Sequence, residues 1–163
     1  MMIWMLKDLT LTKTTSDWTY QCLPFTSEQI EDHYGFVYQI TDTTNDKKYI
    51  GKKFFWNKRR LPPLKGKKNR RIKMVESDWQ DYFGSSEEVK LLVEQSGRDR
   101  FKREVLVLCK SKGECAYWEA KLQFKYDVLL KDEYYNEFIG CKIHSAHVKT
   151  LRDNYVSNGD ENT

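Results

Sequence analysis

The sequence predicts a mixed α+β fold in one domain, and three observations support this prediction. Residues 34–41 and 47–54 are rich in aromatic and β-branched side chains and flank turn-forming residues, which predicts a β-hairpin. Residues 103–109 form an apolar run with flanking charge, typical of a buried central strand. Capping-box patterns predict helices over 86–96 and 111–130. A chain of 163 residues, 39% of them hydrophobic, is long enough to bury one core.

The predicted hairpin brings two tyrosines together. A loop centred at positions 43–44 places Tyr38 opposite Tyr49, with both phenols on the same face of the sheet. The Asn45-Asp46 turn signal can shift this register by a residue or two. Two tyrosines in a hairpin are also explained simply as strand-forming aromatics, so the pair by itself does not define a site.

The second predicted helix contains a carboxylate at the edge of its buried face. We expect this helix to begin at Ser111 and to place a core-facing stripe at four-residue spacing. The stripe consists of Ala116, Ala120, Phe124 and Val128. Glu119 lies beside it, where a carboxylate needs a cation, a metal or a hydrogen-bond donor. The alternative is a solvated glutamate at the boundary of the face.

The most basic part of the chain follows Tyr49. Of the 28 Lys and Arg residues, eleven lie between Lys52 and Lys73, which leaves 17 basic against 24 acidic residues elsewhere. This segment has no Asp or Glu, and Pro62-Pro63 with Gly66 predicts a loop in its middle. Such asymmetry predicts a polyanion-binding face, with a solvated charged loop as the alternative. The predicted nucleic-acid contacts are Lys52, Lys53, Lys58, Arg60, Lys67, Lys68, Arg70 and Arg71.

Composition limits the setting of the protein. No apolar run approaches the roughly 18 residues of a transmembrane helix, and the first residues lack the order of a signal peptide. We therefore expect a cytoplasmic protein with no membrane partner and no small-molecule cofactor. The four cysteines have no close paired spacing, which predicts reduced thiols. A zinc site is the alternative, with the ligands Cys109, Cys115, Cys141 and His144.

Several short motifs, taken together, resemble those of the GIY-YIG nuclease superfamily. In order, they are Phe36-Val37-Tyr38, then after ten residues Tyr49-Ile50-Gly51, a strand at 101–106, a helical Glu119, and Tyr135-Asn136. Residues 77–85 and 110–114 further resemble phage Seg-type homing endonucleases. Five motifs in the right order are more specific than any one of them. The resemblance covers residues 34–145.

The resemblance implies both a fold and an activity. The fold is a three-stranded antiparallel sheet flanked by helices, with strands near 34–41, 47–53 and 103–109. The activity is hydrolysis of phosphodiester bonds in double-stranded DNA with magnesium, or another divalent cation such as manganese. If the chain is phage-encoded, the expected location is the host cytoplasm.

The resemblance also assigns roles to individual residues. Glu119 is the expected metal ligand, and Tyr49 is the expected general base or water-positioning group. An unperturbed phenol has a pKa of about 10, so Tyr49 requires a metal or cationic neighbours to act as a base. Tyr38 is expected to orient water and phosphate, and Asn136 to brace the site through hydrogen bonds.

Two departures from the family pattern affect this assignment. The first motif reads Phe-Val-Tyr instead of Gly-Ile-Tyr, which keeps the tyrosine. The family arginine is expected about ten residues after the second tyrosine, which selects Arg59 as the catalytic cation that holds phosphate oxygens. The alternatives are Arg60, Arg70, Arg71 and Lys53.

The expected organisation has three parts. Residues 1–33, which include Trp4, are an N-terminal extension packed on the domain, and residues 34–145 form the nuclease domain. Residues 146–163 are a polar C-terminal tail that we expect to be disordered. Besides an active endonuclease, two hypotheses remain. One is a catalytically inactive nucleic-acid-binding module on the same fold, and the other is a phage protein that binds a host protein through its N-terminal segment.

Overall fold

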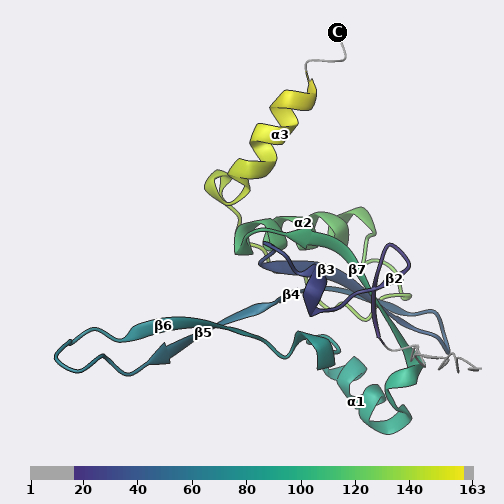
Figure 1. Cartoon of the computed structure of the whole chain (residues 1–163). Helices are drawn as coiled ribbons and strands as arrows, with labels where there is room; N and C mark the ends of the chain where they lie inside the picture. Colours follow the sequence, from purple (N-terminus) through teal and green to yellow (C-terminus); the bar gives the residue numbers. More distant parts are fainter. Residues whose placement is uncertain (1–16, 160–163) are drawn as a thin grey trace, which may run out of the picture.

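The computed structural model describes residues 17–159, with side chains up to residue 154 (Figure 1). Seven strands are present in this range: β1 (Trp18–Tyr20), β2 (Leu23–Pro24), β3 (Gly35–Asp42), β4 (Lys48–Phe54), β5 (Trp56–Leu61), β6 (Arg71–Glu76) and β7 (Phe101–Cys109). The α-helices are α1 (Glu87–Ser96), α2 (Lys112–Lys125) and α3 (Lys149–Gly159). Short 3-10 turns cover Ser27–Gln29, Trp79–Asp81, Arg98–Arg100 and Ser145–Val148. The predicted α+β class is confirmed.

The main sheet has five strands in the order β2-β1-β7-β3-β4. Its three long strands, β3, β4 and β7, are antiparallel and lie where the sequence predicts them. The prediction of three strands is nevertheless wrong, because β1 pairs in parallel with β7 and β2 extends the sheet further. β1 and β2 have three and two residues, too few to produce a recognisable alternation of polar and apolar side chains.

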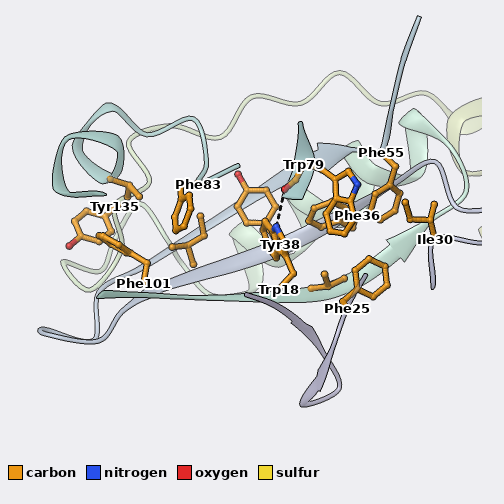
Figure 2. Close-up of a cluster of buried hydrophobic side chains, with 13 residues drawn as sticks. Trp18, Phe25, Ile30, Phe36, Tyr38, Phe55, Trp79, Phe83, Phe101 and Tyr135 are labelled. Carbon is orange, nitrogen blue, oxygen red and sulfur yellow. Dashed lines mark hydrogen bonds between the residues drawn. The ribbon is translucent and has the colours of Figure 1, made fainter. Parts of the chain in front are cut away.

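Two clusters of buried side chains cover the two faces of the sheet. The larger is aromatic and includes Trp18, Phe36 and Trp79, and the Trp18 indole donates to the Trp79 carbonyl at 2.9 Å (Figure 2). The smaller lies under α2 and includes Val37 and Ile50. Full burial of each such side chain contributes about 1.5–3 kcal/mol to folding. Because β3 supplies alternate residues to both clusters, the strand is fixed from both sides.

Both predicted helices are present, but the second is shorter than expected. α1 begins after Ser86, whose side chain accepts from the Val89 amide, and ends at Gly97, where φ is 84°. α2 ends at Lys125, and the predicted stripe is wrong at Phe124, whose side chain is 62% exposed, although Ala120 is buried as predicted. The physical reason is a turn at Asp127, where φ is 52°. This turn returns the buried Val128 to the core from outside the helix.

The basic segment forms a second, two-stranded sheet. The predicted loop occupies residues 62–70, but the flanking residues form β5 and β6, which pair with each other and project from the domain (Figure 1). The predicted loop in the middle of the segment is therefore present, whereas the strands on either side of it were not predicted. The charged residues hide the strand pattern here, because they interrupt the aromatic and β-branched runs by which a strand is recognised.

The structure also describes parts of the predicted N-terminal extension and C-terminal tail. Within the N-terminal extension, Trp18 and Phe25 are buried, whereas Trp4 lies outside the described residues. The C-terminal tail contains the 3-10 turn Ser145–Val148 and α3 instead of the expected disorder, and residues 160–163 are outside the described range. No helix of residues 17–159 is long and apolar enough to cross a membrane.

Candidate active site

The two motif tyrosines lie on the same face of the sheet, as predicted, but they are not directly opposite. Tyr38 faces Gly51 and Tyr49 faces Ile40, a register two residues away from the predicted one. A two-residue change preserves the face because side chains alternate with a period of two. The rings remain diagonal neighbours, with their centroids 6.2 Å apart.

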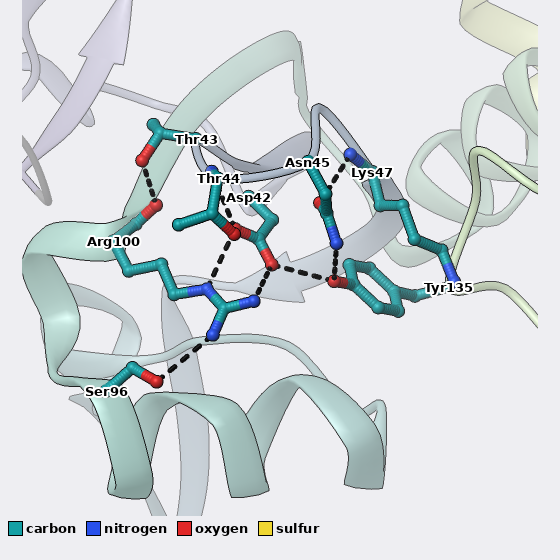
Figure 3. Close-up of polar contacts among 8 residues, drawn as sticks. All are labelled: Asp42, Thr43, Thr44, Asn45, Lys47, Ser96, Arg100 and Tyr135. Atoms are coloured by element: carbon teal, nitrogen blue, oxygen red, sulfur yellow. Dashed lines mark hydrogen bonds and ion pairs between the residues drawn. The ribbon is translucent and has the colours of Figure 1, made fainter.

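The hairpin loop explains this register. Asp42 accepts hydrogen bonds from the amide and the hydroxyl of Thr44 at 3.0 and 2.7 Å, which ends β3 at Asp42 (Figure 3). Asp46 has a φ of 58°, and its amide donates to the Asp42 carbonyl at 2.8 Å. The first strand therefore continues one residue further than predicted before the chain turns.

The buried Asp42 carboxylate is the centre of a polar network that fixes this loop. The Arg100 guanidinium donates to both carboxylate oxygens at 2.8 and 2.6 Å, and the Tyr135 hydroxyl donates at 2.8 Å (Figure 3). Burial alone would raise the pKa of Asp42. The donors of Arg100, Thr44 and Tyr135 outweigh burial and hold this pKa well below its usual range.

Tyr38 occupies a closed position beside Gly51. A side chain at position 51 would place its Cβ 2.5 Å from the Tyr38 hydroxyl oxygen, so glycine is required for the ring to lie there. The Tyr38 hydroxyl is completely buried and has no hydrogen-bond partner among the described residues. Burial, together with the neighbouring Tyr82 and Tyr49, raises the pKa of Tyr38 well above its ordinary value.

A pocket of about 480 Å³ opens at the edge strand β4. Its walls come from β4, from α2 and from two segments, 85–87 and 135–140. Three of the predicted site residues line it, namely Tyr49, Glu119 and Asn136, and so do the predicted nucleic-acid contacts Lys52 and Lys53. Tyr38 does not line the pocket but lies behind Tyr49.

The Tyr49 phenol points toward Ser85, and the two hydroxyl oxygens are 2.7 Å apart. Partial burial raises the pKa of Tyr49, the hydrogen bond with Ser85 opposes this change, and nearby Tyr82 and Glu119 add to it. The phenol is therefore protonated at neutral pH. Deprotonation requires additional positive charge in the pocket.

Two lysines of β4 supply positive charge to the pocket, and each has a carboxylate partner. Lys52 forms an ion pair with Glu119 of α2. Lys53 donates to Asp78 at 2.6 Å and lies 3.9 Å from the centroid of the Tyr82 ring. Because β4 is the edge strand, adjacent residues on its opposite faces both reach the same opening.

Asn136 holds the edge strand in place. Its amide oxygen accepts from the Ile50 amide at 3.0 Å, and its amide nitrogen donates to the Ile50 carbonyl at 2.8 Å. Gln123 donates to the same carbonyl at 2.9 Å. These bonds satisfy a buried backbone position that has no neighbour on that side among the strands of residues 17–159. Asn136 is thus a positioning residue for β4, between Tyr49 and Lys52.

The structure does not bring Arg59 into the pocket. Arg59 lies on β5, where it pairs with Lys73 across the projecting hairpin, and the alternatives Arg60, Arg70 and Arg71 belong to the same hairpin and its loop. None of these arginines lines the pocket. The cations that line the pocket are instead Lys52 and Lys53. The remaining predicted contacts, Lys58, Lys67 and Lys68, are exposed on the hairpin.

Sequence reasoning missed Ser85 and Gln123 as pocket residues. Gln123 follows Glu119 by four positions, a spacing that places both side chains on one helix face and could have identified it. Ser85 precedes α1 and had no such signal, since its contact with Tyr49 joins residues 36 positions apart. Only tertiary packing brings this pair together.

Glu119 could hold a hard divalent cation in the pocket. Its carboxylate would supply one oxygen ligand, and water and phosphate oxygens would complete the coordination that magnesium prefers. Within residues 17–159, the alternative zinc ligands do not form a cluster. The possible ligands in this range that lie close enough to one another to hold an ion are instead Glu31, Asp32 and His33, and these residues do not line the pocket.

Comparison with known families identifies the domain. Residues 18–139 match the family model described as "putative endonuclease segE, GIY-YIG domain", a range that runs from β1 to just beyond Asn136. No curated protein and no solved structure matches the chain. The match includes every residue of the pocket except Gly140, and a nuclease domain implies a nucleic-acid substrate. The chain belongs to the Seg-type GIY-YIG endonuclease family.

Proposed function

We propose that this protein is a divalent-metal-dependent endonuclease that hydrolyses double-stranded DNA. The observation that carries the proposal is one pocket that contains Tyr49, Lys52 and Glu119. Tyr49 and Lys52 belong to β4, and the basic hairpin begins directly after this strand. A base candidate, a cation and a metal-ligating carboxylate are the groups that phosphodiester hydrolysis requires. The relation to phage homing endonucleases is part of the same proposal.

The first part of the mechanism concerns the attacking water. Hydrolysis joins the water oxygen to phosphorus, breaks one phosphorus–oxygen ester bond and moves a water proton to a base. Tyr49 is the proposed base, assisted by Ser85, which can donate to the phenolate oxygen at 2.7 Å. Because the pKa of Tyr49 is raised in the free protein, this role depends on positive charge that approaches with the substrate and the metal.

The second part concerns the phosphate. Lys52 and Lys53 would bind its non-bridging oxygens, and their present partners, Glu119 and Asp78, would be released or shared. Glu119 would hold the metal ion, with magnesium as the proposed ion and manganese as a substitute. When bound, the ion supplies Lewis-acid stabilisation of the charge that develops on the phosphate and the leaving oxygen.

A plasmid assay tests this proposal. Purified protein with magnesium is expected to nick or cut plasmid DNA. Glu119→Gln and Tyr49→Phe are expected to lower the cleavage rate by about 10²-fold or more, because each removes a group that acts on the reacting atoms. Both variants are expected to retain DNA binding in a gel-shift assay.

Matched controls separate chemistry from general damage. Glu94→Gln changes an exposed glutamate of α1, and Tyr126→Phe changes a partly exposed tyrosine after α2, so both are expected to cleave as the unmodified protein does. Equal cleavage by Glu119→Gln and the unmodified protein would contradict the mechanism. Binding without cleavage in either magnesium or manganese would instead favour the inactive binding module.

A further inference from the structure

The β5–β6 hairpin projects from the domain and is strongly basic (Figure 1). Residues 56–76 contain one acidic residue, Glu76, at the base of the hairpin. The cations on the strands and the connecting loop are Lys58, Arg59, Arg60, Lys65, Lys67, Lys68, Arg70, Arg71 and Lys73, and all are exposed. The hairpin is therefore a separate cationic element that lies outside the pocket.

These cations have no acidic partner among the described residues. The ion pairs of residues 17–154 all lie elsewhere, and Arg59 instead faces Lys73 directly across the two strands. Like charges in such a pair are destabilising, by an amount on the order of 0.2–1 kcal/mol. A two-stranded hairpin is also only marginally stable without a third strand. A bound polyanion would remove this repulsion.

The base of the hairpin is firmly attached to the domain. The Trp56 indole donates to the His33 carbonyl at 3.1 Å, and the Ser77 amide donates to the Phe55 carbonyl at 2.7 Å. The Glu76 carboxylate accepts from Ser27 at 2.6 Å and from the Trp79 indole at 2.7 Å. The hairpin thus leaves the domain in a fixed direction, directly after the pocket residues of β4.

Positive charge is present on both faces of the ribbon. The register places Arg59, Arg71 and Lys73 on one face. The other face carries Lys58 and Arg60 beside two exposed apolar side chains, Ile72 and Met74. A ribbon of this kind can contact phosphates on both sides while its apolar and arginine side chains reach base edges.

We propose that the β5–β6 hairpin is the arm that holds duplex DNA in the major groove, and that Arg59 acts in this arm and not in the pocket. Paired strands lie about 4.8 Å apart, and a major groove about 12 Å wide admits a two-stranded ribbon, whereas the minor groove is about half as wide. The inference rests on the proposed function in its choice of DNA as the polyanion.

The same geometry excludes double-stranded RNA as the preferred ligand. The major groove of A-form RNA is deep and narrow, so a ribbon with side chains on both faces cannot enter it. Binding through phosphates alone would not make this distinction, because both duplexes present them. Preference for DNA over RNA duplex of the same sequence is therefore a direct consequence of groove insertion.

Salt dependence measures the contribution of the arm. The measurement uses Glu119→Gln protein, whose cleavage is expected to be about 10²-fold slower or more, and a short duplex of mixed sequence. Combining Lys67→Gln, Lys68→Gln and Arg70→Gln is expected to flatten the plot of log affinity against log salt by roughly 0.9 per lost phosphate contact. The control combines Lys125→Gln, Lys131→Gln and Lys149→Gln, exposed lysines outside the hairpin with the same charge change. Equal slopes in the two triple variants would overturn the proposal.

Arg59 is tested by separating binding from chemistry. Arg59→Gln is expected to require more DNA for saturation, with the loss appearing in the dissociation constant. In single-turnover cleavage at saturating DNA, its rate should exceed that of Tyr49→Phe by at least about 10-fold, because removal of a base costs about 10²-fold or more. A cleavage rate at saturating DNA as low as that of Tyr49→Phe would indicate that Arg59 takes part in the chemical step, and it would contradict the assignment of Arg59 to the arm.

Competitors test the groove. Methyl green, which occupies the major groove, is expected to displace the protein, whereas netropsin in the minor groove is not. An RNA duplex of the same sequence is expected to compete poorly. Displacement by netropsin but not methyl green would overturn the groove assignment, as would equal competition by RNA.

The two proposals fail separately. If the protein never cleaves but the hairpin triple variant flattens the salt slope and the control does not, the arm stands and the endonuclease proposal fails. If the protein cleaves through Glu119 while both triple variants bind alike, the endonuclease proposal stands and the arm fails.

Discussion

At the scale of single residues, two members of the tyrosine motifs act through packing. Gly51 leaves the space that the Tyr38 ring occupies, and Tyr38 in turn supports Tyr49 at a centroid distance of 6.2 Å. The glycine is thus required by the tyrosine of the neighbouring strand. The Tyr49 phenol is the member of this group that reaches the pocket.

Replacing Gly51 tests this packing. Gly51→Ala is expected to lower the free energy of unfolding by about 1–3 kcal/mol, because the new Cβ overlaps the Tyr38 hydroxyl and the buried ring must move. Urea denaturation gives the change. Gly140→Ala is the control, since its Cβ would meet the exposed Phe138 side chain at 3.3 Å, and we expect a change within about 0.5 kcal/mol. Equal effects would show that Tyr38 has room to move.

The buried Tyr38 hydroxyl gives a second prediction at this scale. An unpaired buried hydroxyl costs about 1–3 kcal/mol, so Tyr38→Phe is expected to leave the free energy of unfolding unchanged or to raise it. Cleavage is expected to change little, because this hydroxyl does not line the pocket and the ring that supports Tyr49 is kept. Denaturation and plasmid cleavage are measured on the same sample. A marked loss of stability would mean that the hydroxyl already has a structural partner.

At the scale of elements, the β3–β4 loop decides where the pocket side chains of β4 lie. The Asp42 network extends β3 and sets the pairing of the two strands, while Asn136 and Gln123 hold β4 at Ile50. The loop thus positions Tyr49, although it lies outside the pocket. A change in the loop is expected to alter both stability and the location of the site.

The contribution of Asp42 to the stability of the fold depends on pH. Because the pKa of Asp42 is lowered in the folded protein, its charged form contributes stability that is complete above its unfolded pKa of about 3.9. That contribution is lost as the pH falls below about 4 toward the folded pKa. Asp42→Asn is expected to cost about 3 kcal/mol at neutral pH, because Arg100 then lacks its partner.

Denaturation at a series of pH values measures this contribution. The difference in unfolding free energy between the unmodified protein and Asp42→Asn should shrink as the pH falls below about 4. Asp46→Asn is the control, because Asn also tolerates the left-handed conformation of this exposed loop residue. A constant difference across the series would show that Asp42 is not held in its charged form.

At the scale of the whole molecule, the protein separates into a packed domain and a projecting arm. The five-stranded sheet is covered on both faces by buried clusters, whereas β5 and β6 pair with each other and reach the core through their base (Figure 1). The uneven charge of the sequence follows this division. Basic residues collect on the arm, where they do not weaken the core by repulsion.

Removing the arm tests its independence. Replacement of residues 58–74 by Asn-Gly joins Asn57 to Val75 through a turn that suits a two-residue hairpin. The melting temperature is expected to stay within a few degrees, because no described core residue lies in the deleted segment. Calorimetry measures this change. A large decrease would show that the arm supports the fold, and DNA binding is expected to weaken strongly.

The sequence by itself determined the fold class, the long strands and the family. These features depend on local patterns, namely runs of aromatic and β-branched residues, helix caps and motifs in a fixed order. They also depend on residue types within the motifs, such as Gly51 in Tyr49-Ile50-Gly51. The concentration of basic residues in one segment was also evident from the sequence, although their charge concealed the strands β5 and β6. The choice of Arg59 for chemistry came from counting along the chain, which gives no direction in space.

Only the tertiary structure decided which groups meet. The Asp42 network fixed the strand register, α2 brought Glu119 to Lys52, and the segment before α1 brought Ser85 to Tyr49. The turn of the chain into β5 carried Arg59 away from the pocket. These outcomes depend on contacts between residues far apart in sequence, whose energies no local pattern contains. Tyr49 and Glu119 could therefore be chosen as pocket residues from the sequence, whereas the choice among the cations required the fold.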